Sequence, residues 1–140
     1  MAPAPKSNWL FKEEPSHYSF DDLLRDGSAL WDGVENNLAL KYLRAVRRGD
    51  EMIFYHTGEE RKAVGLMKAV ADARPDPTRK EARFAVLEVQ PVRKLRRAVP
   101  LSEIKSDPVF AGFDLLRLPR LSVMPVSEKF WTAILKMSER

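Results

Sequence analysis

The sequence predicts one α+β domain in which five or six strands close into a small barrel with helices at its periphery. Three observations predict it. The chain has 140 residues, 44% of them hydrophobic and 31% charged, which suits a single hydrophobic core. Runs typical of strands fill the middle of the chain, and apolar residues at helical spacing come before and after that region. A barrel is the favoured closure because it removes exposed strand edges. We expect residues 1–7 to be a disordered tail and residues 8–140 to be the domain.

The N-terminal elements have short, recognisable signals. Residues 8–12 form an aromatic and aliphatic run, which indicates a first strand. Ser19 begins a helix that Gly27 ends, since an acid follows the serine by three residues as in a capping box. Leu23 and Leu24 are expected on the buried side of this helix.

A second helix is expected after a loop over residues 30–35, with Asn36 or Asn37 as its N-cap. Its apolar stripe is Leu40, Leu43 and Val46. The cations on its other side or at its C-terminal end, where they suit the helix dipole, are Lys41, Arg44, Arg47 and Arg48.

Strands dominate the middle of the chain. Three are expected, over residues 52–57, 63–73 and 84–92. Residues 58–61 are the predicted hairpin connection between the first two strands, and residues 75–80 form an exposed loop before the third.

The C-terminal region adds a short helix over residues 100–107 and a strand over residues 121–126. This strand should lie at an edge because Pro125 cannot donate to a ladder. Ser127 caps the last helix, whose core-facing stripe is Phe130, Trp131, Ile134 and Leu135.

The composition excludes several function classes. The chain has no cysteine, which excludes disulfides, thiolate nucleophiles and iron–sulfur clusters, and only two histidines, which are too few for an imidazole metal cage. We therefore expect no cofactor and no metal site. No apolar run approaches the ~18 residues of a membrane span, and the N-terminus lacks a secretory signal, so we expect a cytoplasmic protein without a membrane partner.

Positive charge is concentrated in the second half of the chain. The first 70 residues carry 10 Lys/Arg and 11 Asp/Glu, whereas the last 70 carry 14 and 9. Such a surface attracts a polyanion. The candidate phosphate-binding residues are Arg79, Lys80, Arg83, Arg93, Lys94, Arg96 and Arg97. Arg74 belongs to the same basic excess.

No motif indicates an enzyme. The six glycines are scattered, so there is no phosphate-binding loop, and no Gly-x-Ser-x-Gly elbow is present. A metal-dependent nuclease built from Asp76, Glu88 and Lys94 is a weak alternative, because any charged domain supplies such a trio.

The more informative residues are aromatic side chains beside loops. Trp31 stands in a glycine-containing segment and either fills the core or forms a pocket wall. Tyr55 should oppose Phe54 and His56, because side chains alternate along a strand. His56 is either a hydrogen-bonded core histidine or part of a polar cavity. A flat ligand between Trp31 and a second aromatic would be held as a base is held outside its stack.

Several segments, taken in order, resemble the motifs of one family, the EVE domain. These are residues 9–15 (WLFKEEP), 18–23 (YSFDDL), 31–36 (WDGVEN), 54–57 (FYHT), 64–66 (VGL), 75–78 (PDPT), 101–105 (LSEIK) and 120–126 (RLSVMPV). Together they extend over nearly the whole chain.

The resemblance implies a PUA-like fold, a small mixed β-barrel with peripheral helices. It also implies non-catalytic recognition of a modified nucleobase in DNA or RNA, as in the more distantly similar YTH domains, which read a methylated base in an aromatic pocket. Trp31 would stack on the base. The residues that would shape or line the pocket are Asp32, Gly33, Val34, Asn36, Lys12, Tyr55, His56, Arg120 and Ser122.

The chain departs from the family pattern at the rim of this pocket. Glu35 and Asn37 stand where the family often has arginine and tyrosine, so a cation and an aromatic are lost. Glu13 replaces a serine, and Phe84 stands where many members carry a tryptophan. These differences predict weaker phosphate contact at the rim and a changed base preference or weaker binding.

Two functions thus compete besides the nuclease. The first is a modified-base reader that binds nucleic acid, with a protein partner supplying the effector function. The second is a small-molecule sensor or protein-interaction module that uses the same pocket. Binding that weakens steeply with salt would favour the first, whereas ligand binding indifferent to salt would favour the second.

Overall fold

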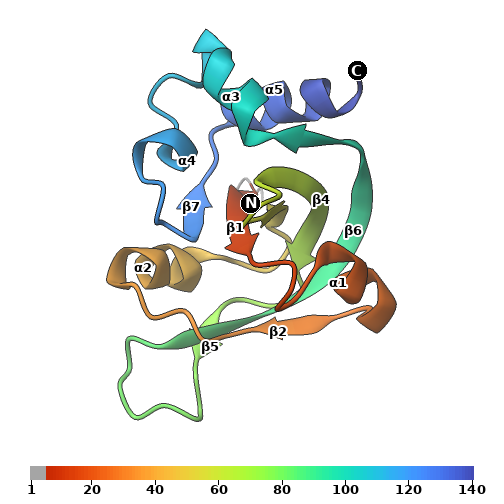
Figure 1. The fold of residues 1–140 in the computed structure, drawn as a ribbon. Helices are drawn as coiled ribbons and strands as arrows, with labels where there is room; N and C mark the ends of the chain where they lie inside the picture. The colour runs from red at the N-terminus through yellow and green to blue at the C-terminus, as the bar shows by residue number, and fades with distance from the viewer. Residues whose placement is uncertain (1–5) are drawn as a thin grey trace, which may run out of the picture.

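The structure is a computed structural model that describes residues 6–140. Six strands follow the order β2-β6-β4-β3-β1-β7 and curl around the core as a half-barrel, and β5 pairs with β6 beside this order (Figure 1). The strands are β1 (Asn8–Glu13), β2 (Ala29–Trp31), β3 (Glu51–His56), β4 (Lys62–Ala69), β5 (Arg74–Pro75), β6 (Ala85–Pro100) and β7 (Val123–Pro125). The helices are α1 (Phe20–Asp26), α2 (Asn37–Ala45), α3 (Leu101–Ser106), η1 (Pro108–Phe110), α4 (Asp114–Arg117) and α5 (Glu128–Ser138). The predicted α+β class is confirmed.

The sheet is mixed, because β1 pairs parallel with β3 and antiparallel with β7. In the parallel pair Phe11 lies opposite Phe54, and Lys12 lies opposite Tyr55. Side chains in register share a face of the sheet, and successive ones alternate. Phe11 and Phe54 therefore lie on one face, with Lys12 and Tyr55 on the other.

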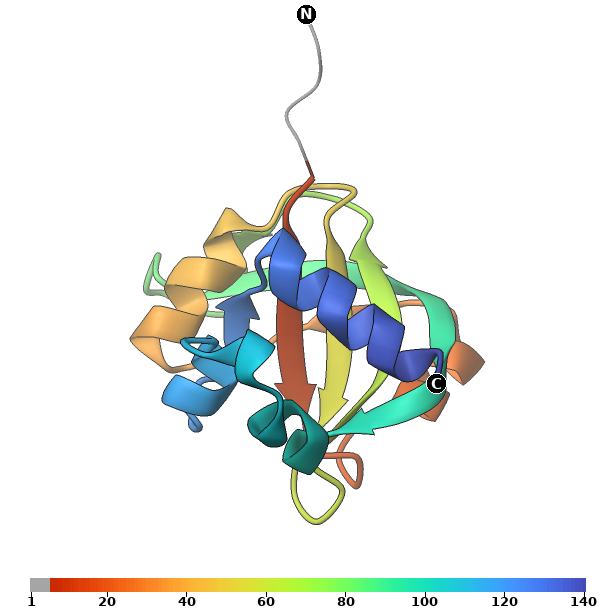
Figure 2. The ribbon, with the colours of Figure 1, turned by 90° about the horizontal axis from the view of Figure 1, so that it is seen from above.

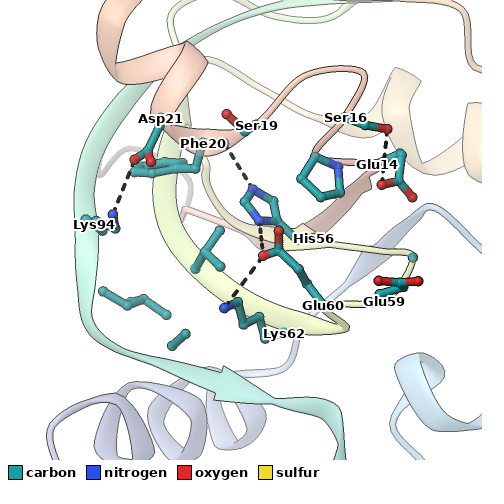
Figure 3. A pocket seen from close by; sticks show the side chains of 15 residues that line it. Glu14, Ser16, Ser19, Phe20, Asp21, His56, Glu59, Glu60, Lys62 and Lys94 are labelled. Carbon is teal, nitrogen blue, oxygen red and sulfur yellow. Dashed lines mark hydrogen bonds and ion pairs between the residues drawn. The ribbon is translucent and has the colours of Figure 1, made fainter.

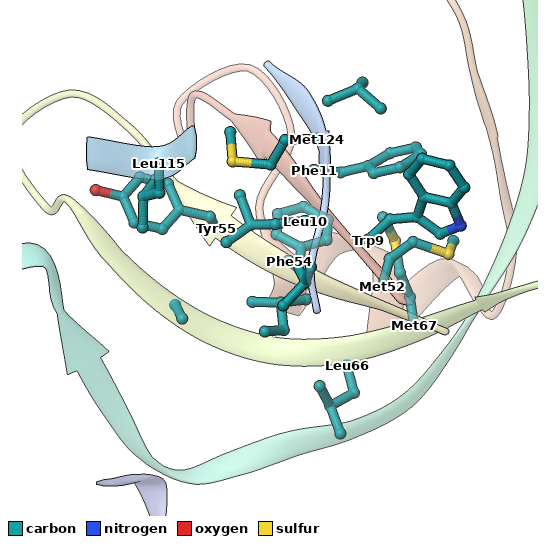
Figure 4. Packing of buried hydrophobic residues seen from close by; sticks show 14 of the residues in the cluster. Trp9, Leu10, Phe11, Met52, Phe54, Tyr55, Leu66, Met67, Leu115 and Met124 are labelled. Atoms are coloured by element: carbon teal, nitrogen blue, oxygen red, sulfur yellow. The ribbon is translucent and has the colours of Figure 1, made fainter. Parts of the chain in front are cut away.

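Aromatic rings build the core on the first of these faces. The centroids of Phe11 and Phe54 each lie 5.4 Å from the Trp31 ring in edge-on contacts, an arrangement that aromatic pairs favour. Phe20 of α1 meets Phe54 in the same way. Figure 4 shows how β1, β3 and β4 bring their side chains together, with Tyr55 directed toward Leu115 on the opposite side.

The two N-terminal helices begin where the sequence predicts. Ser19 forms a capping box with Asp22, and Gly27 ends α1 in the left-handed conformation with φ of 77°. Asn36 caps α2 by accepting a hydrogen bond from the backbone N–H of Ala39. The prediction that Leu24 is buried was wrong: its side chain is 43% exposed, because the next residue after buried Leu23 is turned by about 100° around the helix.

The helices cover the two halves of the long strand β6. α2 packs against β6 and β7, and α5 packs against β6. Figure 2 shows α5 across the front of the molecule, with α2 to its left. Ser127 caps α5, as predicted, by accepting from the N–H of Phe130. β7 lies at the end of the strand order, which confirms the expected edge position of the proline-containing strand.

Three predicted elements differ most from the structure, and tertiary pairing explains the first two. Residues 29–31, of which 30 and 31 were expected in a loop, form β2 because they pair with residues 87–89 of β6. The strand expected over 84–92 continues to Pro100, since its second half also pairs with β4. β4 ends at Ala69 rather than at residue 73.

The start of β1 is held by a buried carboxylate. Asp50 accepts hydrogen bonds from the backbone N–H groups of Ser7 and Arg47 and from the indole Nε1 of Trp9, at 2.9–3.1 Å. The predicted disordered tail falls largely on residues 1–5, which lie outside the described residues. Across residues 6–140, no helix is long and apolar enough to cross a membrane.

Candidate functional site

A small cavity opens beside Trp31, between the end of β1, the segment before α1 and β2. Its volume is about 170 Å³. The side chains that line it are those of Glu13, His17, Tyr18, Ala29, Leu30, Trp31 and Asp32. Two aromatic rings, one exposed leucine and two carboxylates thus border one small space.

Trp31 serves both of the roles that its sequence context allowed. The side chain is 7% exposed and packs against Phe11 and Phe54, so it belongs to the core. It also borders the cavity. Leu30 precedes it on β2, is 47% exposed and also borders the cavity. Trp31 is therefore an anchored wall whose position the core fixes.

Tyr18 is the second aromatic residue at this cavity. Its hydroxyl donates to the Oδ2 of Asp26 at 2.9 Å, which holds the ring in place. Burial and this acceptor raise the pKa of Tyr18 to about 12, so the hydroxyl remains protonated at neutral pH. The capping box that starts α1 follows directly at Ser19 and fixes the backbone beside the ring.

Glu13 supplies a fixed carboxylate at the same cavity. Its Oε1 accepts from the backbone N–H of Glu14 at 3.0 Å and lies 3.1 Å from the Nδ1 of His17. Within residues 6–140 the Oε2 atom forms no hydrogen bond. A carboxylate with one oxygen anchored and one free is an acceptor ready for a ligand's N–H group.

The segment after Trp31 only partly follows the sequence prediction. Asp32 lines the cavity and is exposed. Gly33 adopts φ of 73°, a left-handed turn that favours glycine. Val34 packs against the core, and Asn36 uses its side chain as the α2 cap. These three residues shape the loop, and they are not among the residues that line the cavity.

Four other expected pocket residues lie away from Trp31. Lys12 and Tyr55 share the opposite face of the sheet, where the Lys12 ammonium lies 5.8 Å from the Tyr55 ring and donates to the carbonyl oxygen of Pro119. Burial lowers the pKa of Lys12 and raises that of Tyr55 to about 12. Ser122 accepts from the Lys12 backbone through its carbonyl oxygen, and Arg120 lies exposed two residues before it.

His56 is a hydrogen-bonded histidine with 8% exposure. Its Nε2 accepts from the backbone N–H of Phe20 at 3.1 Å, so the proton is on Nδ1, which lies 2.9 Å from the Oε1 of Glu60 (Figure 3). The histidine thereby joins β3, α1 and the connection between β3 and β4. It faces a different and larger cleft of about 800 Å³.

This larger cleft has the wrong charge for a polyanion. Its lining contains the carboxylates of Glu14, Asp21, Glu59 and Glu60 against the ammonium groups of Lys62 and Lys94 (Figure 3). Lys94, a predicted phosphate ligand, lies 3.3 Å from the Oδ1 of Asp21. The hydrogen bond from His56 lowers the pKa of Glu60, so that carboxylate stays charged. Size alone therefore does not identify the nucleic-acid site.

The predicted phosphate-binding residues divide into two groups. Arg79 and Arg83 lie in the segment between β5 and β6, where their guanidinium groups pack on Phe84 with 3.7 and 4.1 Å between carbon and ring centroid. Arg83 also donates to the carbonyl oxygen of Glu35, and Arg79 lies 3.6 Å from the Glu35 carboxylate. These two cations therefore lie beside the loop that follows Trp31. Lys80 is exposed in the same segment.

The second group follows the far half of β6. Arg97 forms a two-bond pair with Glu103 and also donates to the carbonyl oxygen of Met137, so it ties β6 to α3 and α5. Arg96 lies 3.9 Å from Glu139, and Arg93 is exposed. Within residues 6–140, no group of three or more His, Asp or Glu side chains is arranged to hold a metal ion.

Sequence reasoning missed five of the seven lining residues: Glu13, His17, Tyr18, Ala29 and Leu30. Tyr18 is part of the YSFDDL motif, and Leu30 directly precedes Trp31, but their place at one cavity depends on the pairing of β2 with β6. His17 carries no sequence signal. Glu13 was noticed only as a departure, although strand alternation places it on the Trp31 face and Lys12 on the other.

The fold and these motifs occur together in known proteins. The EVE domain pattern matches residues 7–137 of the chain. This chain belongs to the EVE domain family. The resemblance inferred from the sequence motifs is thereby confirmed, including its PUA-like fold.

Two curated relatives illustrate the similarity of this EVE domain to known proteins. Human thymocyte nuclear protein 1 is 30% identical, in an alignment that covers 96% of this chain and 75% of that protein. The mouse protein of the same name is 32% identical over 94% of this chain and 73% of its own length.

Solved structures extend the comparison. A protein of Rhodopseudomonas palustris superposes with a TM-score of 0.90 at 34% identity, covering 95% of this chain and 93% of that one. Human thymocyte nuclear protein 1 in complex with 5-methylcytosine-containing DNA superposes with a TM-score of 0.89 at 31% identity, covering 96% and 99%. The YTH domain of a Zygosaccharomyces rouxii protein, in complex with N6-methyladenosine RNA, shares the fold at a TM-score of 0.58 and 15% identity, covering 99% and 91%.

Proposed function

We propose that this EVE domain binds nucleic acid without catalysis and holds one modified base in the cavity beside Trp31. The observation that carries the proposal is the composition of that cavity: the rings of Trp31 and Tyr18, the exposed Leu30 and the half-free carboxylate of Glu13 line one space of about 170 Å³. Aromatic and apolar walls favour a flipped base, and the carboxylate reads its edge.

The chemistry of Glu13 favours a base that carries an exocyclic amino group. A carboxylate accepts hydrogen bonds and repels a carbonyl oxygen, so it pairs with the N4 amino group of cytosine rather than the O4 of thymine. Leu30 offers apolar contact to a substituent on the ring. A 5-substituted cytosine satisfies both conditions, since it carries an amino group and an apolar substituent.

The rim supports a backbone contact beside this cavity. Arg79 and Arg83 approach the loop after Trp31 from a different segment, and their stacking on Phe84 fixes the planes of the guanidinium groups. They supply positive charge where Glu35 stands in place of the arginine usual in the family. The human relative solved with 5-methylcytosine DNA, at 31% identity, supports nucleic acid as the partner.

The test is titration of labelled single strands that differ at one central base: cytosine, 5-methylcytosine, 5-hydroxymethylcytosine, thymine, adenine or N6-methyladenine. We expect a modified cytosine to bind at least tenfold more tightly than thymine, on the order of the 1–3 kcal/mol that one well-placed base contact contributes. Thymine is the sharpest control, since it differs from 5-methylcytosine at the 4-position substituent and N3 and keeps the methyl group.

Variants must avoid the core. Trp31→Ala would remove a packed core ring and destabilise the fold, so Leu30→Asp and Glu13→Gln are preferable. Leu30→Asp should abolish the base preference, and Glu13→Gln, whose amide also donates, should narrow the difference between cytosine and thymine. Equal binding of all six strands, or an unchanged preference in both variants, would overturn the proposed site.

A further inference from the structure

Three arginine side chains outside the sequence-predicted phosphate set line one cavity of about 340 Å³. They are Arg44 at the end of α2, Arg47 just after it and Arg74 in β5. Asp72 is the single acidic side chain in the lining, and Phe84 forms part of the wall. The space therefore holds three cations against one anion.

The guanidinium groups are positioned but not neutralised. Arg44 donates to the carbonyl oxygen of Arg83, and Arg47 donates to the carbonyl oxygens of Arg44 and Val46. Within residues 6–140, none of the three arginines forms an ion pair, and the Arg74 side chain forms no hydrogen bond. Each guanidinium carries five donors, so most donors of the cluster remain free.

The cluster is continuous with the rim of the proposed base cavity. Arg44 contacts Arg83, Arg83 contacts Glu35 and Asn37, and these two residues belong to the segment that leads away from Trp31. Phe84 contacts Arg79 and Arg83 and also borders the arginine cavity. A strand whose base enters the Trp31 cavity would meet these cations next.

We propose that Arg44, Arg47 and Arg74 form a backbone-phosphate site for the nucleic-acid strand, one that positions the strand without reading its sequence. Guanidinium forks match phosphate oxygens in geometry and charge. The inference rests on the proposed nucleic-acid function but not on base reading, because a phosphate site binds any strand.

The experiment measures affinity for a 5-methylcytosine strand and for an abasic strand of equal length over a series of salt concentrations. In Arg44→Gln/Arg47→Gln/Arg74→Gln the affinity should fall on the order of tenfold at low salt. The slope of log affinity against log salt should become shallower by about 2, since each lost single-strand phosphate contact removes roughly 0.7. The ratio of the affinities for the 5-methylcytosine strand and the abasic strand should not change.

Two controls separate this site from charge and folding effects. Lys105→Gln/Lys129→Gln/Lys136→Gln removes the same charge at exposed positions on α3 and α5 and should leave the salt slope unchanged. Arg74→Gln alone breaks no side-chain hydrogen bond of the described structure. It should still make the slope of log affinity against log salt shallower by roughly 0.7, the value of one phosphate contact. Titration of the abasic strand should also shift the Nε–Hε resonances of the three arginines.

The outcomes distinguish the two proposals. An unchanged salt slope in the arginine variants would overturn the phosphate site while leaving base preference intact. The same would follow if the lysine variant lost as much affinity and slope as the triple arginine variant. A wild-type protein without base preference whose slope still falls in the arginine variants supports the phosphate site and contradicts base reading. Failure of the wild-type protein to bind either strand at low salt would overturn both.

Discussion

Strand alternation sets the roles of individual side chains around β1 and β3. Glu13 reaches the Trp31 cavity, whereas Lys12, one residue earlier, reaches Tyr55 on the opposite face. His56 lies on the Trp31 side but its ring is used by the backbone of α1 and by Glu60. Neighbouring residues of one strand therefore reach different surroundings, because successive side chains lie on opposite faces of the sheet.

His56 gives a test at this scale. His56→Ala should lower the free energy of unfolding by about 1–3 kcal/mol, because it removes the acceptor of the buried N–H of Phe20 and the partner of Glu60. Urea unfolding measures it. His17→Ala is the matched control, since that side chain is 78% exposed, and it should change stability by less than about 0.5 kcal/mol. Equal effects in the two variants would contradict the structural role of His56.

At the scale of elements, α1 links the core to the candidate site. Its capping box fixes the backbone directly after Tyr18, and its first residue, Phe20, packs on Phe54. A seven-residue helix has little stability of its own, so its ends and its packing decide whether it forms.

Ser19→Ala should destabilise the domain by about 1 kcal/mol, because the N–H of Asp22 loses its side-chain acceptor. Because α1 follows Tyr18, the variant should also weaken base binding relative to phosphate binding. Urea unfolding and titration with 5-methylcytosine and abasic strands measure the two effects. Ser28→Ala, at an exposed position after the helix, should change neither quantity.

At the scale of the whole molecule, hydrogen-bonded carboxylates make the stability of the fold depend on pH. Four of them have a pKa below the ordinary value because donors hold the charged form. These are Asp22 with the backbone N–H of Ser19, Asp26 with the side chain of Arg25, Glu60 with that of His56 and Asp76 with that of Thr78.

A carboxylate whose pKa is lower in the folded state than in the unfolded state stabilises the fold when the pH is above the unfolded pKa. This stabilisation is lost as the pH falls through the folded-state pKa. With ordinary values of 3.8 for aspartate and 4.5 for glutamate, the melting temperature should be insensitive to these groups above about pH 5 and should fall below about pH 4. Thermal unfolding between pH 2 and pH 7 measures it. The melting temperature of Asp22→Asn/Asp76→Asn should fall less on acidification than that of the wild type. An identical fall in both proteins would contradict this account.

The sequence by itself determined the α+β class, the helix caps Ser19 and Ser127, the edge strand with Pro125 and the family, and it narrowed the cap of α2 to Asn36 or Asn37. These features depend on local chemistry: a side-chain acceptor at a helix start, a missing N–H, and motifs read in order. It left Trp31 as either a core residue or a pocket wall, because this tryptophan stands in a glycine-containing segment.

Only the tertiary structure decided which residues share that pocket. β2 exists because it pairs with β6, and that pairing brings Leu30 and Trp31 to the side chains of Glu13 and Tyr18. In the same way, β5 and the end of α2 bring Arg74 next to Arg44 and Arg47, although nearly thirty residues separate them in sequence. Pairings between distant segments depend on the whole core, so no local pattern specifies them, and the site forms where those pairings meet.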